Sequence, residues 1–179
     1  MKMKKPSKIL ILHGWEGNPN LYWFPLAKKR FEEIGFEVHV PEMPGGYFPK
    51  KDEWLKVIDG LNVDENWILI GHSLGGVAIL KFLETASKPI AKAILIATPV
   101  EPMKFLPISN FFGEGFNWPK IKQNCSNFVV LNENADSVVP VSHGEQLAEA
   151  LGIKLNVVSG YSHFHKIDLD FLEKLLVKE

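Results

Sequence analysis

The sequence predicts an α/β fold built on a mostly parallel, doubly wound sheet of six strands with helices on both faces. Short runs rich in Val, Ile and Leu alternate along the chain with stretches whose apolar residues recur at helical spacing. Parallel strands covered on both faces have continuous apolar sequences of this kind. The 179 residues suffice for one sizeable core, so we expect a single domain over residues 1–179, without a lid domain.

Six segments have the composition of buried strands, and they are residues 8–12, 36–40, 67–71, 92–97, 127–131 and 153–158. Right-handed crossovers between them predict the sheet order 2-1-3-4-5-6, with the first and third strands adjacent. Ligands of doubly wound sheets bind beyond the carboxyl ends of the strands, where the order reverses. This rule selects two loops, residues 13–20 and residues 71–76.

The intervening helices are marked by residues that begin and end helices. The expected helices cover 22–34 before Gly35, 52–59 before Gly60 and 74–86, followed by one with Asn117 as N-cap and Pro119 in its first turn, one that the capping box Ser142-x-x-Glu145 opens and Gly152 closes, and a last one that Asp168 caps.

Residues 98–117 form the one long stretch without clear periodicity, and they follow the fourth predicted strand. The stretch carries Phe105, Phe111, Phe112 and Phe116 among Pro and Gly residues. Loops of this length are usually functional or disordered, and its aromatic residues argue against disorder. We expect it to lie beside the point where the strand order reverses.

The composition excludes several kinds of partner. The net charge of −1 provides no bulk attraction to nucleic acids or acidic membranes. No apolar run approaches the roughly 20 residues of a membrane span, and the apolar run near the N-terminus is too short for a signal peptide. The single cysteine, Cys125, cannot form an internal disulfide and is expected to pack at a strand entrance. We therefore expect a cytoplasmic protein, a monomer or weak dimer.

The strongest chemical motif is Gly71-His72-Ser73-Leu74-Gly75. An apolar strand precedes it and a predicted helix follows it, which is the arrangement of the nucleophile elbow in α/β-hydrolases. The turn places Ser73 at a helix N-terminus, where N–H groups and the helix dipole favour a developing oxyanion. Ser73 is the candidate nucleophile; the alternative is a Gly-rich turn with a passive serine.

A serine nucleophile needs a base that a third group holds in place. In α/β-hydrolases the acid and then the histidine follow the serine along the chain. Asp136, in the turn after the fifth predicted strand, is the preferred acid. Glu133, nearer the strand end, is the second candidate and would otherwise be a solvated loop charge.

Two histidines, His163 and His165, follow the last predicted strand, and either could reach back over the serine. His143 lies within the expected capping-box turn and is expected to be exposed on a helix. The His-x-His pair has no third ligand at metal spacing, so we expect neither a metal nor a cofactor.

The loop after the first strand begins His13-Gly14-Trp15. The backbone N–H groups of Trp15 and Leu74 are the candidate oxyanion donors, since one such donor follows the nucleophile and another comes from an early loop. His13 and His72 are expected to be hydrogen-bonded turn residues. Trp15, Phe111 and Phe112 are candidates for lining a substrate pocket, with core packing as the alternative.

The sequence resembles the retinoblastoma-binding-protein-nine type of serine hydrolase, a compact branch of the α/β-hydrolases. The resemblance spans nearly the whole chain and depends on His13-Gly14-Trp15, Tyr22-Trp23-Phe24-Pro25, Met43-Pro44, Asp52-x-Trp54, the Ser73 motif, Asp136-x-Val138-Val139-Pro140 and His163-Phe164. That family carries its catalytic histidine in a Gly-His-Phe stretch. Here the stretch is Ser162-His163-Phe164, which matches His163 and departs at Ser162.

The resemblance implies a triad of Ser73, His163 and Asp136 and hydrolysis of carboxylic esters with short acyl chains. The family's Leu-x-Cys-x-Glu motif is absent around Cys125, so retinoblastoma-type partner binding is not expected. We expect a carboxylesterase-like serine hydrolase that acts on a small-molecule acyl substrate through an acyl-enzyme. The alternatives are a catalytically idle binding module and the same triad acting on peptide or thioester bonds.

Overall fold

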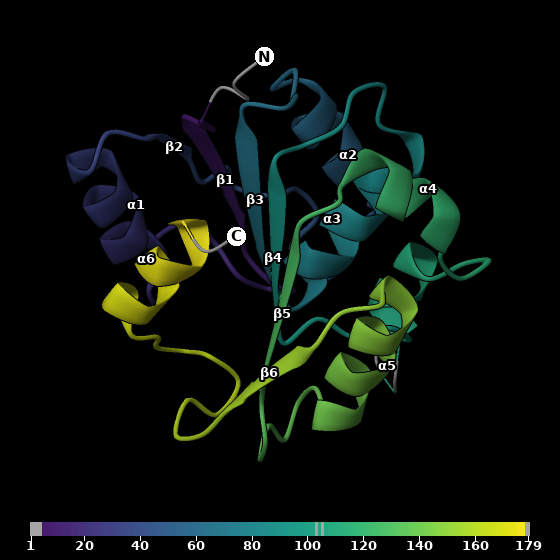
Figure 1. Ribbon diagram of the computed structural model, residues 1–179. Helices are drawn as coiled ribbons and strands as arrows, with labels where there is room; N and C mark the ends of the chain where they lie inside the picture. The colour runs from purple at the N-terminus through teal and green to yellow at the C-terminus, as the bar shows by residue number, and fades with distance from the viewer. Residues whose placement is uncertain (1–4, 103, 105, 178–179) are drawn as a thin grey trace.

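A computed structural model describes residues 5–102, 104 and 106–177 of the chain, and its centre is one six-stranded sheet (Figure 1). The strand order is β2-β1-β3-β4-β5-β6, and all five pairings are parallel, as predicted. The strands are β1 (Lys8–Leu12), β2 (Glu37–His39), β3 (Trp67–His72), β4 (Lys92–Ile96), β5 (Phe128–Glu133) and β6 (Leu155–Val158).

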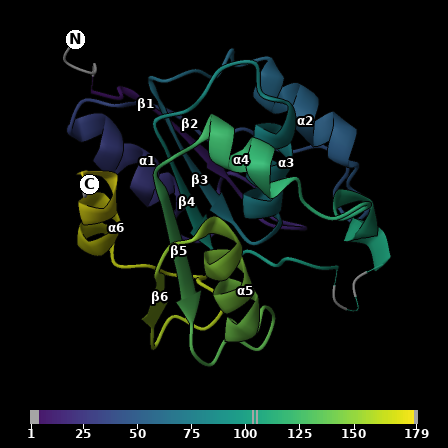
Figure 2. The same cartoon turned by 45° about the vertical axis from the view of Figure 1, so that its right-hand side comes forward.

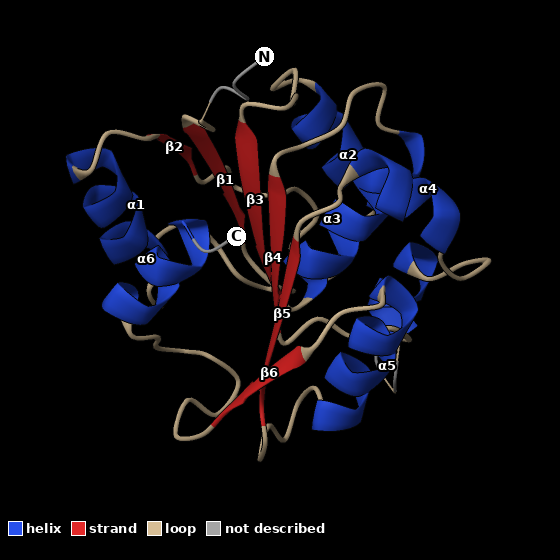
Figure 3. Ribbon diagram, viewed as in Figure 1, coloured by secondary structure: helices blue, strands red, loops and turns tan. Residues whose placement is uncertain are grey.

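Helices cover both faces of the sheet (Figure 3). They are α1 (Phe24–Glu33), α2 (Lys51–Asp59), α3 (Leu74–Thr85), α4 (Trp118–Asn124), α5 (Val141–Leu151) and α6 (Leu169–Val177), with a short 3₁₀ helix η1 (Leu106–Phe111). Figure 2 shows α1 and α6 together on one side and the other helices on the opposite side. The predicted doubly wound α/β architecture is confirmed.

The sheet separates two hydrophobic cores because successive strand residues point to opposite faces. In β1, Ile9 and Ile11 join the core under α1 and α6, whereas Leu10 and Leu12 join the core under α2 and α3. The helix α3 is buried along most of its length, which explains why its sequence is apolar on every side. The carboxyl ends of β1 and β3 therefore lie between two packed layers.

Most helix ends follow the sequence, but the start of α5 does not. The side chains of Asn117 and Asp168 accept backbone N–H hydrogen bonds at their helix starts, as predicted. The capping box at Ser142 was wrong: α5 begins at Val141, Pro140 occupies the N-cap, and no side chain caps it. The chain turns earlier because the Asp136 carboxylate accepts the N–H groups that precede Pro140.

His143 is buried, with 5% of its surface exposed, which corrects the expectation of an exposed helix position. Its Nδ1 accepts the backbone N–H of Val100 at 3.2 Å, so it ties the start of the 98–117 segment to α5. Desolvation by burial lowers the pKa of His143, and the nearby charge of Glu101 opposes this effect. The imidazole is thus a neutral acceptor inside the protein.

The segment 98–117 contains more structure than its sequence suggests. Its 3₁₀ helix packs on α3, and the Asn110 side chain joins it to the start of α2. Asn110 Oδ1 accepts the N–H of Lys51 at 2.7 Å, and Nδ2 donates to the Pro49 carbonyl at 3.0 Å. Phe105 lies outside the described residues. None of the described helices has both the length and the apolar composition that a membrane crossing requires.

Candidate active site

Ser73 occupies the sharp turn between β3 and α3 with a left-handed backbone, φ 53° and ψ −120°. Its N–H donates to the Ile96 carbonyl at 2.8 Å. A Cβ at Gly71 would lie 2.5 Å from the Cα of Gly76, and one at Gly75 would lie 2.4 Å from the Leu12 carbonyl oxygen. Since these neighbours are backbone atoms, both positions require glycine. The two glycines of the motif are therefore required by the tight turn that carries Ser73.

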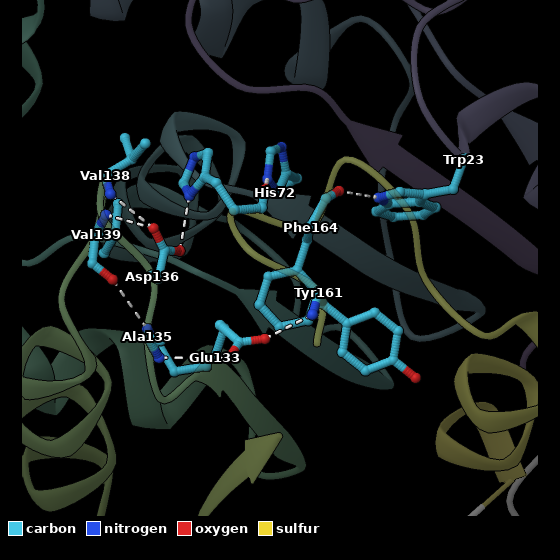
Figure 4. A network of polar contacts seen from close by, with 11 residues as sticks. Trp23, His72, Glu133, Ala135, Asp136, Val138, Val139, Tyr161 and Phe164 are labelled. Atoms are coloured by element: carbon cyan, nitrogen blue, oxygen red, sulfur yellow. Dashed lines mark hydrogen bonds and ion pairs between the residues drawn. The ribbon is translucent and has the colours of Figure 1, made fainter. Parts of the chain in front are cut away.

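The structure brings His163 and Asp136 together from the loops after β6 and β5. His163 Nδ1 lies 2.8 Å from Asp136 Oδ2, and Asp136 Oδ1 accepts the N–H groups of Val138 and Val139 at 2.8 and 2.9 Å (Figure 4). Burial favours a higher pKa for Asp136, but the hydrogen bonds from His163 and from these two N–H groups hold the pKa below its ordinary value. Asp136 is therefore an anion that orients the imidazole.

The loop that carries His163 is held in a strained conformation. Gly160, Ser162 and Phe164 all have left-handed φ angles, 89°, 52° and 53°. The Phe164 ring is fully buried against Tyr161, and the Phe164 carbonyl accepts a 3.0 Å hydrogen bond from the Trp23 indole. Strain of this kind persists only where surrounding contacts over-determine it, and here they direct His163 toward Asp136.

Glu133 is not the solvated charge considered above, because only 2% of its surface is exposed. Its carboxylate accepts the N–H of Tyr161 at 2.6 Å and that of Ala135 at 3.3 Å, so it supports the His163 loop from beneath. His165 is exposed and stacks on the ring of Tyr22 with a centroid distance of 4.5 Å. Of the two histidine candidates, the structure thus places His163 against the acid.

His72 and His13 are hydrogen-bonded, as predicted. His72 Nε2 donates to the His163 carbonyl at 2.9 Å, and burial, reinforced by the nearby His163, lowers the pKa of His72 to about 3. His13 Nε2 accepts the N–H of Met43 at 3.0 Å, and Nδ1 donates to the Gly14 carbonyl at 2.7 Å. Both neutral imidazoles join the loops that surround Ser73.

A cavity of about 250 Å³ opens above Ser73. Ser73, His163 and His72 provide its polar lining. The rest of the lining comes from the segments that follow four strands: Gly14, Trp15, Gly17, Tyr22, Leu74, Pro99, Ile108 and Val138. Tyr22, Ile108 and Val138 were missed in the sequence. Tyr22 could have been proposed because it is an aromatic residue that closely follows the loop of residues 13–20. No local sequence pattern indicates that Ile108 or Val138 would line the cavity.

Phe111 and Phe112 do not line this cavity, which corrects the pocket expectation. Both belong to the core under α3, and Phe111 packs edge-on against Trp54 at 5.3 Å. Burying these large rings removes more apolar surface from water than a site open to solvent would. From the 98–117 segment, Pro99 and Ile108 reach the cavity instead.

The two candidate oxyanion donors belong to two segments that adjoin Ser73. Leu74 is the first residue of α3, where backbone N–H groups have no partner within the helix. Gly14 precedes Trp15 and passes so close to Ser73 that a Cβ on Gly14 would lie 3.0 Å from the Ser73 Cβ. A hydroxyl, a carboxylate-bound imidazole and helix N-terminal N–H groups around one cavity are the groups that acyl transfer uses.

Comparisons with known proteins identify a family for the chain. The serine hydrolase family model matches residues 9–170. YdeN of Bacillus subtilis is 30% identical over 163 residues, which cover 88% of this chain and 86% of that protein. The serine hydrolase RBBP9 of Rattus norvegicus is 26% identical over 180 residues, 97% of this chain and 96% of the relative.

Solved structures show the same fold. The structure of the ydeN gene product of B. subtilis has a TM-score of 0.88 and 26% identity, covering 96% of this chain and 100% of that chain. Est1E from Butyrivibrio proteoclasticus has a TM-score of 0.72 at 15% identity, covering 96% of this chain and 86% of that chain.

Proposed function

Because the chain belongs to the serine hydrolase family, we propose that it hydrolyses small carboxylic esters with Ser73 as nucleophile, His163 as general base and Asp136 as the orienting acid. The observation that carries the proposal is the 2.8 Å bond between His163 Nδ1 and Asp136 Oδ2 beside Ser73 in one cavity. Because Nδ1 is occupied by this bond, Nε2 of His163 is the ring nitrogen that accepts the hydroxyl proton of Ser73.

The reaction would proceed in two halves. Ser73 Oγ attacks the ester carbonyl while His163 takes the hydroxyl proton, and the N–H groups of Trp15 and Leu74 stabilise the oxyanion. His163 then returns the proton to the leaving alcohol, which departs and leaves an acyl group on Ser73. A water molecule, deprotonated by His163, attacks the acyl-enzyme and releases the carboxylic acid.

The substrate we propose is a small molecule, because the cavity of about 250 Å³ is near the lower end of typical ligand pockets. Its walls of Trp15, Pro99, Ile108 and Val138 suit a short apolar acyl or alcohol group. The cytoplasmic location and the monomeric or weakly dimeric state stay predictions from the sequence.

The experiment compares Ser73→Ala with the parent protein on p-nitrophenyl acetate and butyrate, and it labels both proteins with a fluorophosphonate. We expect Ser73→Ala to lose about 10³-fold or more in kcat and to form no adduct. Ser142→Ala, an exposed serine in α5, is the matched control and should keep full activity.

Equal rates for the parent and Ser73→Ala would overturn the proposal. A folded parent that neither cleaves esters nor reacts with the fluorophosphonate would favour the idle binding module. Labelling of Ser73 combined with faster cleavage of peptide or thioester substrates would keep the triad and change the substrate class.

A further inference from the structure

Three aromatic side chains continue outward from the cavity above Ser73. Trp15 lines the cavity, and its ring centroid lies 5.0 Å from that of Tyr47. Tyr47 lies 4.9 Å from Phe48, in an edge-to-face arrangement. We call Trp15, Tyr47 and Phe48 the aromatic platform. It is continuous with the candidate active site, although Tyr47 and Phe48 come from the loop that connects β2 to α2.

The aromatic platform exposes a large apolar surface to solvent. Phe48 is 71% exposed, more than any other exposed large hydrophobic side chain among the described residues, and Tyr47 is 49% exposed. Neighbouring aromatic groups gain free energy from edge-to-face or offset contacts with a further ring. An exposed cluster of this kind next to a cavity indicates a binding surface rather than a chance exposure.

The loop that presents these rings is anchored at several points. Its start is joined to His13 by the Met43 N–H, and the Trp54 indole donates to the Pro44 carbonyl at 2.8 Å. The Trp15 indole donates to the Tyr47 carbonyl at 2.9 Å. At its end, the Pro49 carbonyl accepts from the Asn110 amide at 3.0 Å. The backbone that presents the rings is thus held before any ligand arrives, which lowers the entropic cost of ordering this loop on binding.

We propose that the aromatic platform binds a planar aromatic group on the part of the substrate that extends beyond the cavity, so that the substrates are aryl-substituted esters. The inference rests on the proposed function, since it assumes that the ester carbonyl lies at Ser73. Trp15 would then contact the substrate in two ways. Its backbone N–H would donate to the carbonyl oxygen, and its ring would form the part of the aromatic platform nearest the cavity, which we call the aryl site together with Tyr47 and Phe48. Tyr47 and Phe48 are specificity residues that take no part in the chemistry.

The test uses two pairs of esters that differ only in aromaticity. Benzyl acetate and cyclohexylmethyl acetate place the ring on the alcohol, whereas methyl 4-phenylbutyrate and methyl 4-cyclohexylbutyrate place it on the acyl chain. Within each pair the rings are similar in size and the leaving alcohols are similar in acidity. The ratio of kcat/KM values within a pair therefore reports recognition of the aromatic face, and ethyl acetate reports the chemistry alone.

We expect the parent protein to prefer the aryl ester of at least one pair by about 2- to 12-fold. Phe48→Ala should bring that ratio close to one, mainly through KM, and leave ethyl acetate hydrolysis unchanged. Tyr47→Ala should lower the ratio in the same direction. Both side chains are exposed, and the Trp15 indole bonds to the Tyr47 carbonyl, so these variants should fold. Leu26→Ala, which truncates a 61% exposed side chain on α1, is the matched control.

Three outcomes would overturn the inference, and they are distinguishable. Hydrolysis of ethyl acetate through Ser73 without any aryl preference would remove the aryl site and leave the proposed function standing. Absence of both hydrolysis and a fluorophosphonate adduct would remove the proposed function, and the aryl site with it. Unchanged selectivity in Phe48→Ala, together with loss of a dimer in sedimentation, would assign the surface to a second copy of the chain.

Discussion

His163 Nδ1 lies 2.8 Å from Asp136 Oδ2, although the two residues are 27 positions apart in the chain. The β5 and β6 strands are adjacent and parallel, so their carboxyl ends deliver the two loops to the same edge of the sheet. Asp136 is oriented in turn by two backbone N–H groups. The pair is therefore preorganised before a substrate arrives.

Asp136→Asn should lower kcat by about 10³- to 10⁴-fold, because the amide favours the wrong tautomer of His163. The fold should survive, since the asparagine Oδ1 can still accept the N–H groups of Val138 and Val139. Steady-state kinetics on a p-nitrophenyl ester provides the measurement. Glu133→Gln is the matched control and should lose far less activity; the reverse result would assign the acid role to Glu133.

Ser162→Gly should stabilise the protein by about 0.5–1 kcal/mol. Ser162 has a φ of 52°, a conformation that costs an L-residue free energy and a glycine very little. Thermal unfolding should show a rise in Tm of about 1–4 °C. Gly160→Ser is the opposite control, because it places a side chain at φ 89° and should lower Tm. A lower Tm for Ser162→Gly would mean that the serine contributes more than its strain costs.

Gly75→Ala should destabilise the protein by at least about 3 kcal/mol, because the new Cβ would lie 2.4 Å from the Leu12 carbonyl oxygen in β1. Urea unfolding measures the loss, and a fall in soluble yield would agree with it. Gly60→Ala is the control, since Gly60 has a φ of −62° that suits any residue and the nearest neighbour of its Cβ would be the Lys56 carbonyl oxygen at 3.3 Å. Equal unfolding free energies for the two variants would contradict the packing of the Ser73 turn.

The free energy of unfolding should fall as the pH is lowered from about 7 to 5. Burial lowers the pKa values of His13, His72 and His143. In this pH range the histidines of the unfolded chain therefore bind protons that the same histidines in the folded protein do not bind. The contribution of these neutral histidines to the free energy of unfolding is fully present above the ordinary histidine pKa of 6.5, and it is lost as the pH falls below that value. With a folded pKa of about 3, His72 alone should remove about 2 kcal/mol at pH 5.

The Asp136 carboxylate does not complicate this range, because its pKa is lowered from 3.8 and its contribution disappears only at lower pH. Urea unfolding between pH 5 and 8 is the measurement. His72→Asn should be less stable at pH 8, where its loss is structural, but should show a shallower pH dependence. Identical slopes for the parent and His72→Asn would mean that the pKa of His72 is the same in the folded and the unfolded protein.

The strand order, the sheet architecture and the family were predictable because each depends on local sequence patterns. Continuous apolar runs identify buried parallel strands, and right-handed crossovers then leave few possible orders. The turn at Ser73 could be predicted from the sequence for a similar reason. Its glycines are required by backbone contacts within a few residues and by one neighbouring strand, so they appear together in the motif.

Residues whose roles depend on distant contacts could not be assigned from the sequence alone. The spacing of His163 and His165 left both possible, and only the packing of Phe164 and the strained loop turns His163 toward Asp136. The burial of Glu133 and His143 depends on backbone N–H groups from other loops, and Phe111 and Phe112 were drawn into the core by α3.

The sequence by itself thus determined where the chain turns and which strand ends carry chemical groups, because those choices are made within a few residues. The tertiary structure decided which side chains face each other, because hydrogen bonds and apolar burial between distant segments select among candidates that are equivalent locally.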